Sequence, residues 1–167
     1  MKHPLLVLLA ALAVLALGQA AYYLPQLPAL VATHFDAAGQ VNGWMSRTYF
    51  FRYQAFLTLG FTALFGVLAL ITSLLPDRLI NLPHREYWFA PARRDETRRR
   101  LAGMILASGC GALAFFIFLH QRICQANLDG TRHLTPSFGV IFAAALVLIV
   151  GPVLRPLWCF WKRPPAG

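Results

Sequence analysis

The stretch LLVLLAALAVLALGQAAYYL, residues 5–24, decides the fold class of this chain. It contains no Asp, Glu, Lys or Arg, and it has the length of about 20 residues that a helix needs to cross the hydrocarbon core of a bilayer. Three later stretches are similarly apolar, at residues 53–75, 101–119 and 137–155. The sequence therefore predicts an all-α, polytopic membrane protein with four transmembrane helices.

The composition of the whole chain supports this prediction. Of 167 residues, 58% are hydrophobic and only 13% are charged, whereas soluble domains contain about 25% charged residues. A single transmembrane domain, residues 1–167, accounts for this composition. The first run also resembles a secretory signal, because Lys2 precedes it and ALGQAA could mark a cleavage site. The run is longer than a signal core of about 7–15 residues and lacks an A-x-A site, so we expect an uncleaved span.

The positive charge of the chain predicts its orientation. The net charge is +9, and the basic residues flank the apolar runs, which indicates a topology signal rather than nucleic-acid binding. Eleven of the fifteen Lys and Arg residues lie on the side of the N-terminus, the second loop and the C-terminus. They are Lys2, Arg78, Arg85, Arg93, Arg94, Arg98, Arg99, Arg100, Arg155, Lys162 and Arg163, against Arg47, Arg52, Arg122 and Arg132 on the other side. We therefore predict that both termini lie in the cytoplasm.

The predicted outer loop, residues 25–52, has the signals of a compact structure. The segment DAAG suits a type I turn with Asp36 first and Gly39 fourth, and Asn42-Gly43 is a second turn signal. Ser46 can cap the helix that leads into the second span. We expect a compact loop, in the form of a small hairpin on the bilayer surface, with Trp44 near the interface.

The polar residues of this loop have a structural and a functional interpretation. In the functional one, His34 and Asp36 bind a cation or a cationic peptide, or act as a base and its orienting acid. In the structural one, Asp36 accepts hydrogen bonds from turn amides while His34 packs against the loop. Two ligands fall short of the three or four of a zinc site, so we expect no metal and no cofactor. The spacing alone favours the structural interpretation.

The predicted inner loop, residues 76–100, is rich in arginine and aromatic residues. ARRDETRRR is a helix-forming run that leads into the third span, and Pro91 suits the first turn of that helix. Asp95 with Arg99 and Glu96 with Arg100 are spaced to form ion pairs. Arginines beside a span attract anionic lipid at about 1 kcal/mol each, so anionic headgroups are the expected partners. A docking face for a cytoplasmic protein is the alternative.

Few other residues suggest chemistry. Cys110, Cys124 and Cys159 form no C-x-x-C pair, and the four spans contain no acidic residue, which counts against a proton-coupled transporter. Glycines in the second and third spans allow close helix contacts and are compatible with a homo-oligomer.

The two loops together resemble the SdpI-like bacterial membrane proteins. That family has an outer pattern LP-x-x-V-x-x-HF-x-x-x-G-x-x-x-x-W-x-S-(K/R), which here reads LPALVATHFDAAGQVNGWMSR. Its inner pattern, N-(I/L)-P-(N/H)-(K/R)-E-Y-W-x-A-P-x-R-R, here reads NLPHREYWFAPARR. The outer residues that match are His34, Phe35, Gly39, Trp44 and Ser46, with Arg47 where Lys is common. The inner ones are Asn81, Pro83, Glu86, Tyr87, Trp88, Pro91, Arg93 and Arg94, with His84 where Asn is common.

The resemblance implies a multi-pass protein of the bacterial cytoplasmic membrane that acts in peptide immunity or signalling. We therefore expect a non-enzymatic protein that binds or senses an envelope ligand or toxic peptide. Its candidate ligand-binding residues are His34, Phe35, Asp36, Gly39, Asn42, Trp44, Ser46 and Arg47. The alternatives are a membrane enzyme that uses His34 with Asp36, or His84 with Glu86, and a small transporter.

Overall fold

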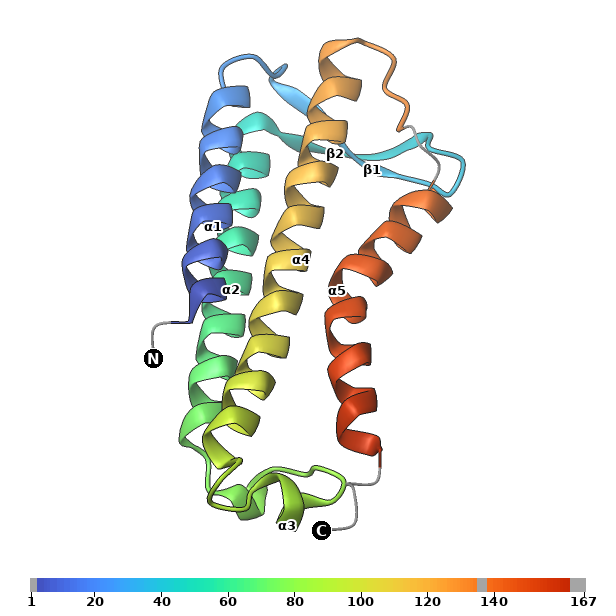
Figure 1. Cartoon of the computed structure of the whole chain (residues 1–167). Helices are drawn as coiled ribbons and strands as arrows, with labels where there is room; N and C mark the ends of the chain where they lie inside the picture. The colour runs from blue at the N-terminus through green and yellow to red at the C-terminus, as the bar shows by residue number, and fades with distance from the viewer. Residues whose placement is uncertain (1–2, 135–137, 163–167) are drawn as a thin grey trace.

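The computed structural model describes residues 3–134 and 138–162, and it contains four long helices (Figure 1). They are α1 (Pro4–Tyr23), α2 (Arg47–Leu74), α4 (Arg94–Leu128) and α5 (Phe138–Trp161). Between α1 and α2 lie two strands, β1 (Leu30–Phe35) and β2 (Val41–Ser46). Between α2 and α4 lie the short helices η1 (Asp77–Leu79) and α3 (Arg85–Trp88).

The prediction of four membrane-spanning helices is confirmed, because all four long helices are long and apolar enough to cross a bilayer. Three of them extend beyond the predicted runs, and α5 does so by six residues, to Trp161. α2 begins six residues before the predicted span, and α4 has 35 residues, which is about 52 Å of helix against a hydrocarbon core of about 30 Å. α4 therefore extends beyond the apolar layer and carries polar residues at its ends.

α4 is the central helix of the bundle. It packs against α1, α2 and α5, and α5 lies on the side of α4 away from α1 and α2 (Figure 1). Small residues allow this packing, most clearly at Gly111, where a Cβ atom would lie 1.9 Å from the carbonyl oxygen of Leu148 on α5. Next to this contact the Ser108 hydroxyl donates a hydrogen bond of 2.7 Å to the carbonyl of Ile149.

The two ends of the bundle carry different structures (Figure 1). At one, which we call the hairpin end, β1 and β2 form an antiparallel hairpin beside the C-terminal part of α4 and the segment that follows it. At the other, which we call the arginine end, residues 75–100 form a folded loop containing η1 and α3.

The hairpin confirms the expectation of a compact loop, but one predicted turn is wrong. The chain reverses at Asp36–Gly39, where the amide of Gly39 donates the expected hydrogen bond of 2.9 Å to the carbonyl of Asp36. Asn42 and Gly43, in contrast, lie within β2. Gly43 is opposite His34 at an irregularity in the strand register. A Cβ atom on Gly43 would lie 2.9 Å from the Cβ atom of His34, so glycine serves close packing here instead of a turn.

Candidate functional site

The hairpin is attached to α4 by one buried side chain, that of Asn127. Its amide nitrogen donates to the carbonyls of Ala32 (2.9 Å) and Ile123 (2.8 Å), and its amide oxygen accepts from the backbone nitrogen of Ala32 (2.8 Å). The Asn127 amide thus binds β1 as a neighbouring strand would, through one backbone donor and one acceptor. This satisfies two backbone groups of β1 that are buried from water.

The tip of the hairpin is attached to the segment after α4. The Asp36 carboxylate accepts hydrogen bonds of 2.9 Å from the amides of Ala38 and Gln40, as the structural interpretation predicted. Gly39 adopts the left-handed conformation (φ 83°), and its carbonyl accepts from the amide of Leu134 at 2.9 Å. The backbone of Gln40 also pairs with that of His133 in an isolated antiparallel β-bridge. The hairpin is therefore fixed at its tip as well as at β1.

Several of the predicted ligand-binding residues have structural contacts in this arrangement. The Ser46 hydroxyl accepts from the amide of Tyr49 at 3.3 Å, which confirms the predicted helix cap. The Arg47 guanidinium donates to the carbonyl of Leu27 at 3.0 Å and fixes the segment before β1. Phe35 packs against a buried cluster that includes Val31 and Cys124. A ligand-binding role for these residues stays a prediction.

Three other predicted residues, His34, Asn42 and Trp44, are exposed on the hairpin. Trp44 is 42% exposed, and the guanidinium of Arg132 lies 5.1 Å from its ring centroid. His34 Nδ1 lies 3.1 Å from the Thr33 hydroxyl, and no hydrogen bond joins His34 to Asp36 in the described hairpin. These three side chains are exposed on a hairpin that is fixed to the bundle, and we refer to them together as the Trp44 surface.

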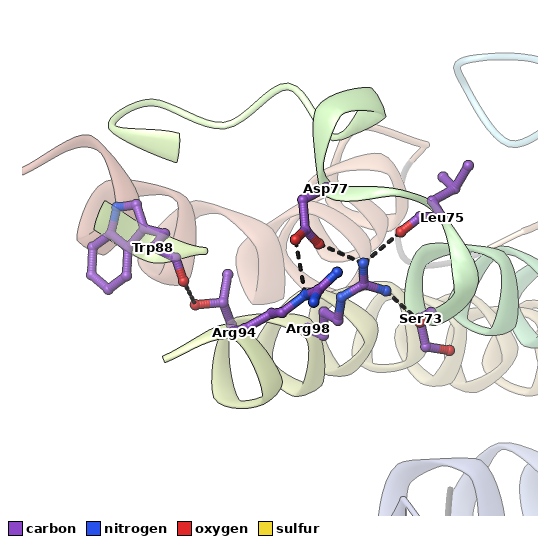
Figure 2. A network of polar contacts seen from close by, with 7 residues as sticks. Ser73, Leu75, Asp77, Trp88, Arg94 and Arg98 are labelled. Carbon is purple, nitrogen blue, oxygen red and sulfur yellow. Dashed lines mark hydrogen bonds and ion pairs between the residues drawn. The ribbon is translucent and has the colours of Figure 1, made fainter. Parts of the chain in front are cut away.

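The arginine end is fixed by an ion-pair network that joins α2 to α4 (Figure 2). Asp77, directly after α2, pairs with Arg94 at 2.8 Å and with Arg98 at 2.5 Å. Arg98 also donates to the carbonyls of Ser73 and Leu75, which are acceptors left unpaired at the end of α2. One carboxylate and one guanidinium thus close the junction between the two longest helices.

The charges of this network determine the ionisation of Asp77. Burial opposes ionisation, but the hydrogen bonds and positive charges of Arg98 and Arg94 outweigh it and lower the pKa of Asp77 below its ordinary value of 3.8. Asp77 is therefore ionised at neutral pH and holds both arginines through charge.

Trp88, which belongs to the inner pattern, is hydrogen-bonded to both α4 and α5. The Trp88 indole donates to the carbonyl of Phe160 on α5 at 3.3 Å, and its own carbonyl accepts from the Thr97 hydroxyl at 2.8 Å. The guanidinium of Arg93 lies 3.9 Å from the ring centroid of Tyr87. The loop thereby connects α4 with α5, and both Arg93 and Arg94 make intramolecular contacts.

Two predictions for this loop need correction. Pro91 lies in a turn in which the Arg93 amide donates to the carbonyl of Ala90, and α4 begins only at Arg94, so Pro91 is outside the first helical turn. Glu96 and Arg100 form the predicted ion pair at 2.6 Å, but no ion pair joins Asp95 and Arg99.

Sequence reasoning missed the two residues that fix the ends, Asn127 and Asp77. Asp77 could have been found, because it is the acidic residue at the start of the loop that leads from the second span to the arginine run. Asn127 had no comparable signal. Of the residues that the structure describes, no three His, Cys, Asp or Glu side chains gather closely enough to hold a metal ion.

Comparison with known proteins gives one match. Residues 11–52 match a family model described as a domain of unknown function, DUF1648. The matched region contains most of α1, the whole hairpin and the start of α2. No curated protein and no solved structure matches the chain.

Proposed function

We propose that this chain is a non-enzymatic, SdpI-like protein of the bacterial cytoplasmic membrane that binds an envelope peptide at the Trp44 surface. The observation that carries this proposal is an exposed tryptophan on a hairpin that is fixed at two places. The DUF1648 match supports it, because that match covers the whole hairpin together with most of α1 and the start of α2.

The chemistry of the Trp44 surface suits a peptide ligand. Trp44 offers a large apolar face with a polar edge, a combination that is enriched at binding hot spots. Asn42 and His34, exposed on the same hairpin, add hydrogen-bonding groups, and Arg132 adds a positive charge at the Trp44 ring. Because the hairpin is already ordered by Asn127 and by the Gln40–His133 bridge, binding costs little ordering of the backbone.

The distribution of charge supports an orientation in which this surface faces the envelope. The arginine end carries most of the Lys and Arg residues that flank the helices, and such residues favour the cytoplasmic side. Both termini then lie in the cytoplasm. Anionic headgroups and a cytoplasmic protein are the partners that we propose for the arginine end.

Orientation can be tested with the cysteines of the chain itself. A cysteine introduced by Ala38→Cys lies at the exposed hairpin tip, whereas the native Cys159 is exposed at the opposite end and Cys110 and Cys124 are buried. We expect a membrane-impermeant maleimide to label the introduced thiol in intact spheroplasts, and Cys159 only after lysis. Labelling of the introduced thiol only after lysis would reverse the orientation and end the envelope-ligand proposal.

Binding can be tested by protection of a host that is sensitive to a secreted toxic peptide. We expect the wild type to protect and Trp44→Ala to lose most of the protection, with a smaller loss for His34→Ala. Trp161→Ala is the matched control, because Trp161 is 70% exposed at the other end of the molecule. Equal protection by the Trp44→Ala and Trp161→Ala variants would contradict the assignment of the Trp44 surface, and no protection by the wild type would remove the immunity role.

A further inference from the structure

A cavity of about 650 Å³ opens at the arginine end, in a part of the chain that the proposed envelope ligand does not use. Its lining comes from η1, from the loop between η1 and α3, and from α3 itself. Two cationic side chains, those of Arg78 and Arg85, line it together with the carboxylate of Glu86. Asn81, His84 and Tyr87 add neutral hydrogen-bonding groups to the lining.

Arg78 and Arg85 differ from the three arginines of this end that are paired with carboxylates. Arg94 and Arg98 are paired with Asp77, and Arg100 is paired with Glu96. Within the described residues, the Arg78 guanidinium takes part in no hydrogen bond or ion pair, and Arg85 donates to the carbonyl of Arg78 at 3.2 Å. Among the described residues, no carboxylate therefore pairs with Arg78 or Arg85, and a hydrogen bond links these two arginines.

The backbone at the cavity wall includes a conformation that residues other than glycine rarely adopt. His84 has a φ of 52° and lies in the left-handed region, directly before α3. Such a conformation costs free energy in a residue other than glycine and persists only where the surroundings impose it. Here it is followed directly by α3, which starts at Arg85, and Arg85 and Glu86 line the same cavity as Arg78.

We propose that this cavity is a binding site for a phosphate-bearing anion, held by Arg78 and Arg85. The planar guanidinium donates two parallel hydrogen bonds to phosphate oxygens, a geometry that a lysine does not provide. The Asn81 amide and the Tyr87 hydroxyl supply neutral donors in the same lining. The negative charge of Glu86 repels the anion. Replacing Glu86 should therefore raise the affinity for the anion, whereas replacing either arginine should lower it.

Two ligands share this chemistry, the headgroup of an anionic phospholipid and free inorganic phosphate. The test uses the full chain purified in a non-ionic detergent. One arm titrates phosphatidylglycerol and follows the bound lipid by native mass spectrometry. The other titrates inorganic phosphate and follows its ³¹P linewidth. Tighter binding of phosphatidylglycerol assigns the site to lipid, and equal binding of both assigns it to the free anion.

The variants decide whether this cavity is the site. We expect the double variant Arg78→Gln, Arg85→Gln to bind at least about tenfold more weakly, as for the loss of hydrogen bonds to a charged group. Arg99→Gln is the matched control, because it removes the same charge from an exposed position of α4 outside the cavity, and we expect a change below about twofold. Glu86→Gln should strengthen binding.

Unchanged binding by the double variant, or a loss no larger than that of Arg99→Gln, would overturn the proposal. Should the double variant fail to fold, Arg78→Gln alone carries the test, because it removes no side-chain hydrogen bond among the described residues. We expect a loss of about threefold or more from that single change. Weaker binding by the Glu86→Gln variant than by the wild type would equally contradict the placement of the anion in this cavity.

Discussion

The hairpin end and the arginine end solve the same structural problem with different chemistry. Each must fix a loop of about 20 residues or more to α4. At the hairpin end, Asn127 does so with neutral hydrogen bonds to the backbone of β1, buried from water. At the arginine end, Asp77 and Arg98 do so with ion pairs in a partly exposed position. The comparison teaches that burial decides the choice, because an unpaired charge is costly where water is excluded.

The first and largest expected effect is at the hairpin end. Asn127→Leu removes three hydrogen bonds and leaves the amide and the carbonyl of Ala32 buried without partners. We expect a loss of about 3 kcal/mol in the free energy of unfolding, since each buried unpaired group costs about 1–3 kcal/mol. The measurement is hydrogen exchange of residues 30–46, which should lose protection.

The control for this variant is Asn42→Leu, which changes the same residue type at an exposed position of β2. It should leave exchange at residues 30–46 close to that of the wild type. Equal protection in both variants would show that Asn127 does not fix the hairpin, and the comparison of the two ends would then fail.

The second effect is at the arginine end. Arg98→Gln removes the pair with Asp77 and the hydrogen bonds to Ser73 and Leu75. We expect a loss of about 2 kcal/mol, less than for a fully buried ion pair, because water reaches Asp77. Thermal unfolding in detergent micelles followed by circular dichroism measures it. Arg99→Gln, an exposed neighbour on α4, should change the midpoint little, and an equal loss in both variants would contradict the network.

The third effect is a pH dependence of stability that we expect at the arginine end, where Asp77 is charged. Because the folded-state pKa of Asp77 is lowered, its contribution is fully present above its ordinary value of 3.8 and is lost as the pH falls through the folded-state pKa. The stability advantage of the wild type over Asp77→Asn should therefore be constant near neutrality and shrink below pH 3.8. Unfolding midpoints of both proteins across this range test it, and an advantage that grows in acid would be the wrong sign.

The smallest effect concerns the cap of α2. Ser46→Ala removes the 3.3 Å hydrogen bond to the amide of Tyr49 at an exposed helix start. We expect a loss of about 0.5 kcal/mol, at the low end for helix caps. Thr48→Ala is the control, since it changes a neighbouring exposed hydroxyl that caps no helix. A loss above about 2 kcal/mol would mean that Ser46 does more than cap α2.

The sequence was most informative where hydrophobicity and local turn chemistry decide the structure. The four helices follow from uncharged runs of sufficient length, and the Asp36 turn and the Ser46 cap follow from short-range hydrogen bonding. Asn42-Gly43 misled because a glycine can serve a close contact as well as a turn, and only the position of His34 distinguishes the two.

The contacts that fix the ends depend on residues far apart in the chain, which local patterns do not relate. Asn127 binds Ala32 across 95 positions, and Trp88 binds Phe160 across 72. The candidate site shows the same limit. The three residues of the Trp44 surface, His34, Asn42 and Trp44, were all named from the sequence, but which of the eight predicted residues face solvent depended on the register of the hairpin.

The length of α4 has a mechanical consequence. A single helix of 35 residues carries the attachment of the hairpin near one terminus and that of the arginine-rich loop near the other. A rod of about 52 Å that tilts by about 5° about its middle moves each tip by roughly 2 Å, in opposite directions. The glycine contact with Leu148 lies near the middle of the rod, where a fulcrum would be. Displacement on one side of the bilayer is thus geometrically linked to displacement on the other.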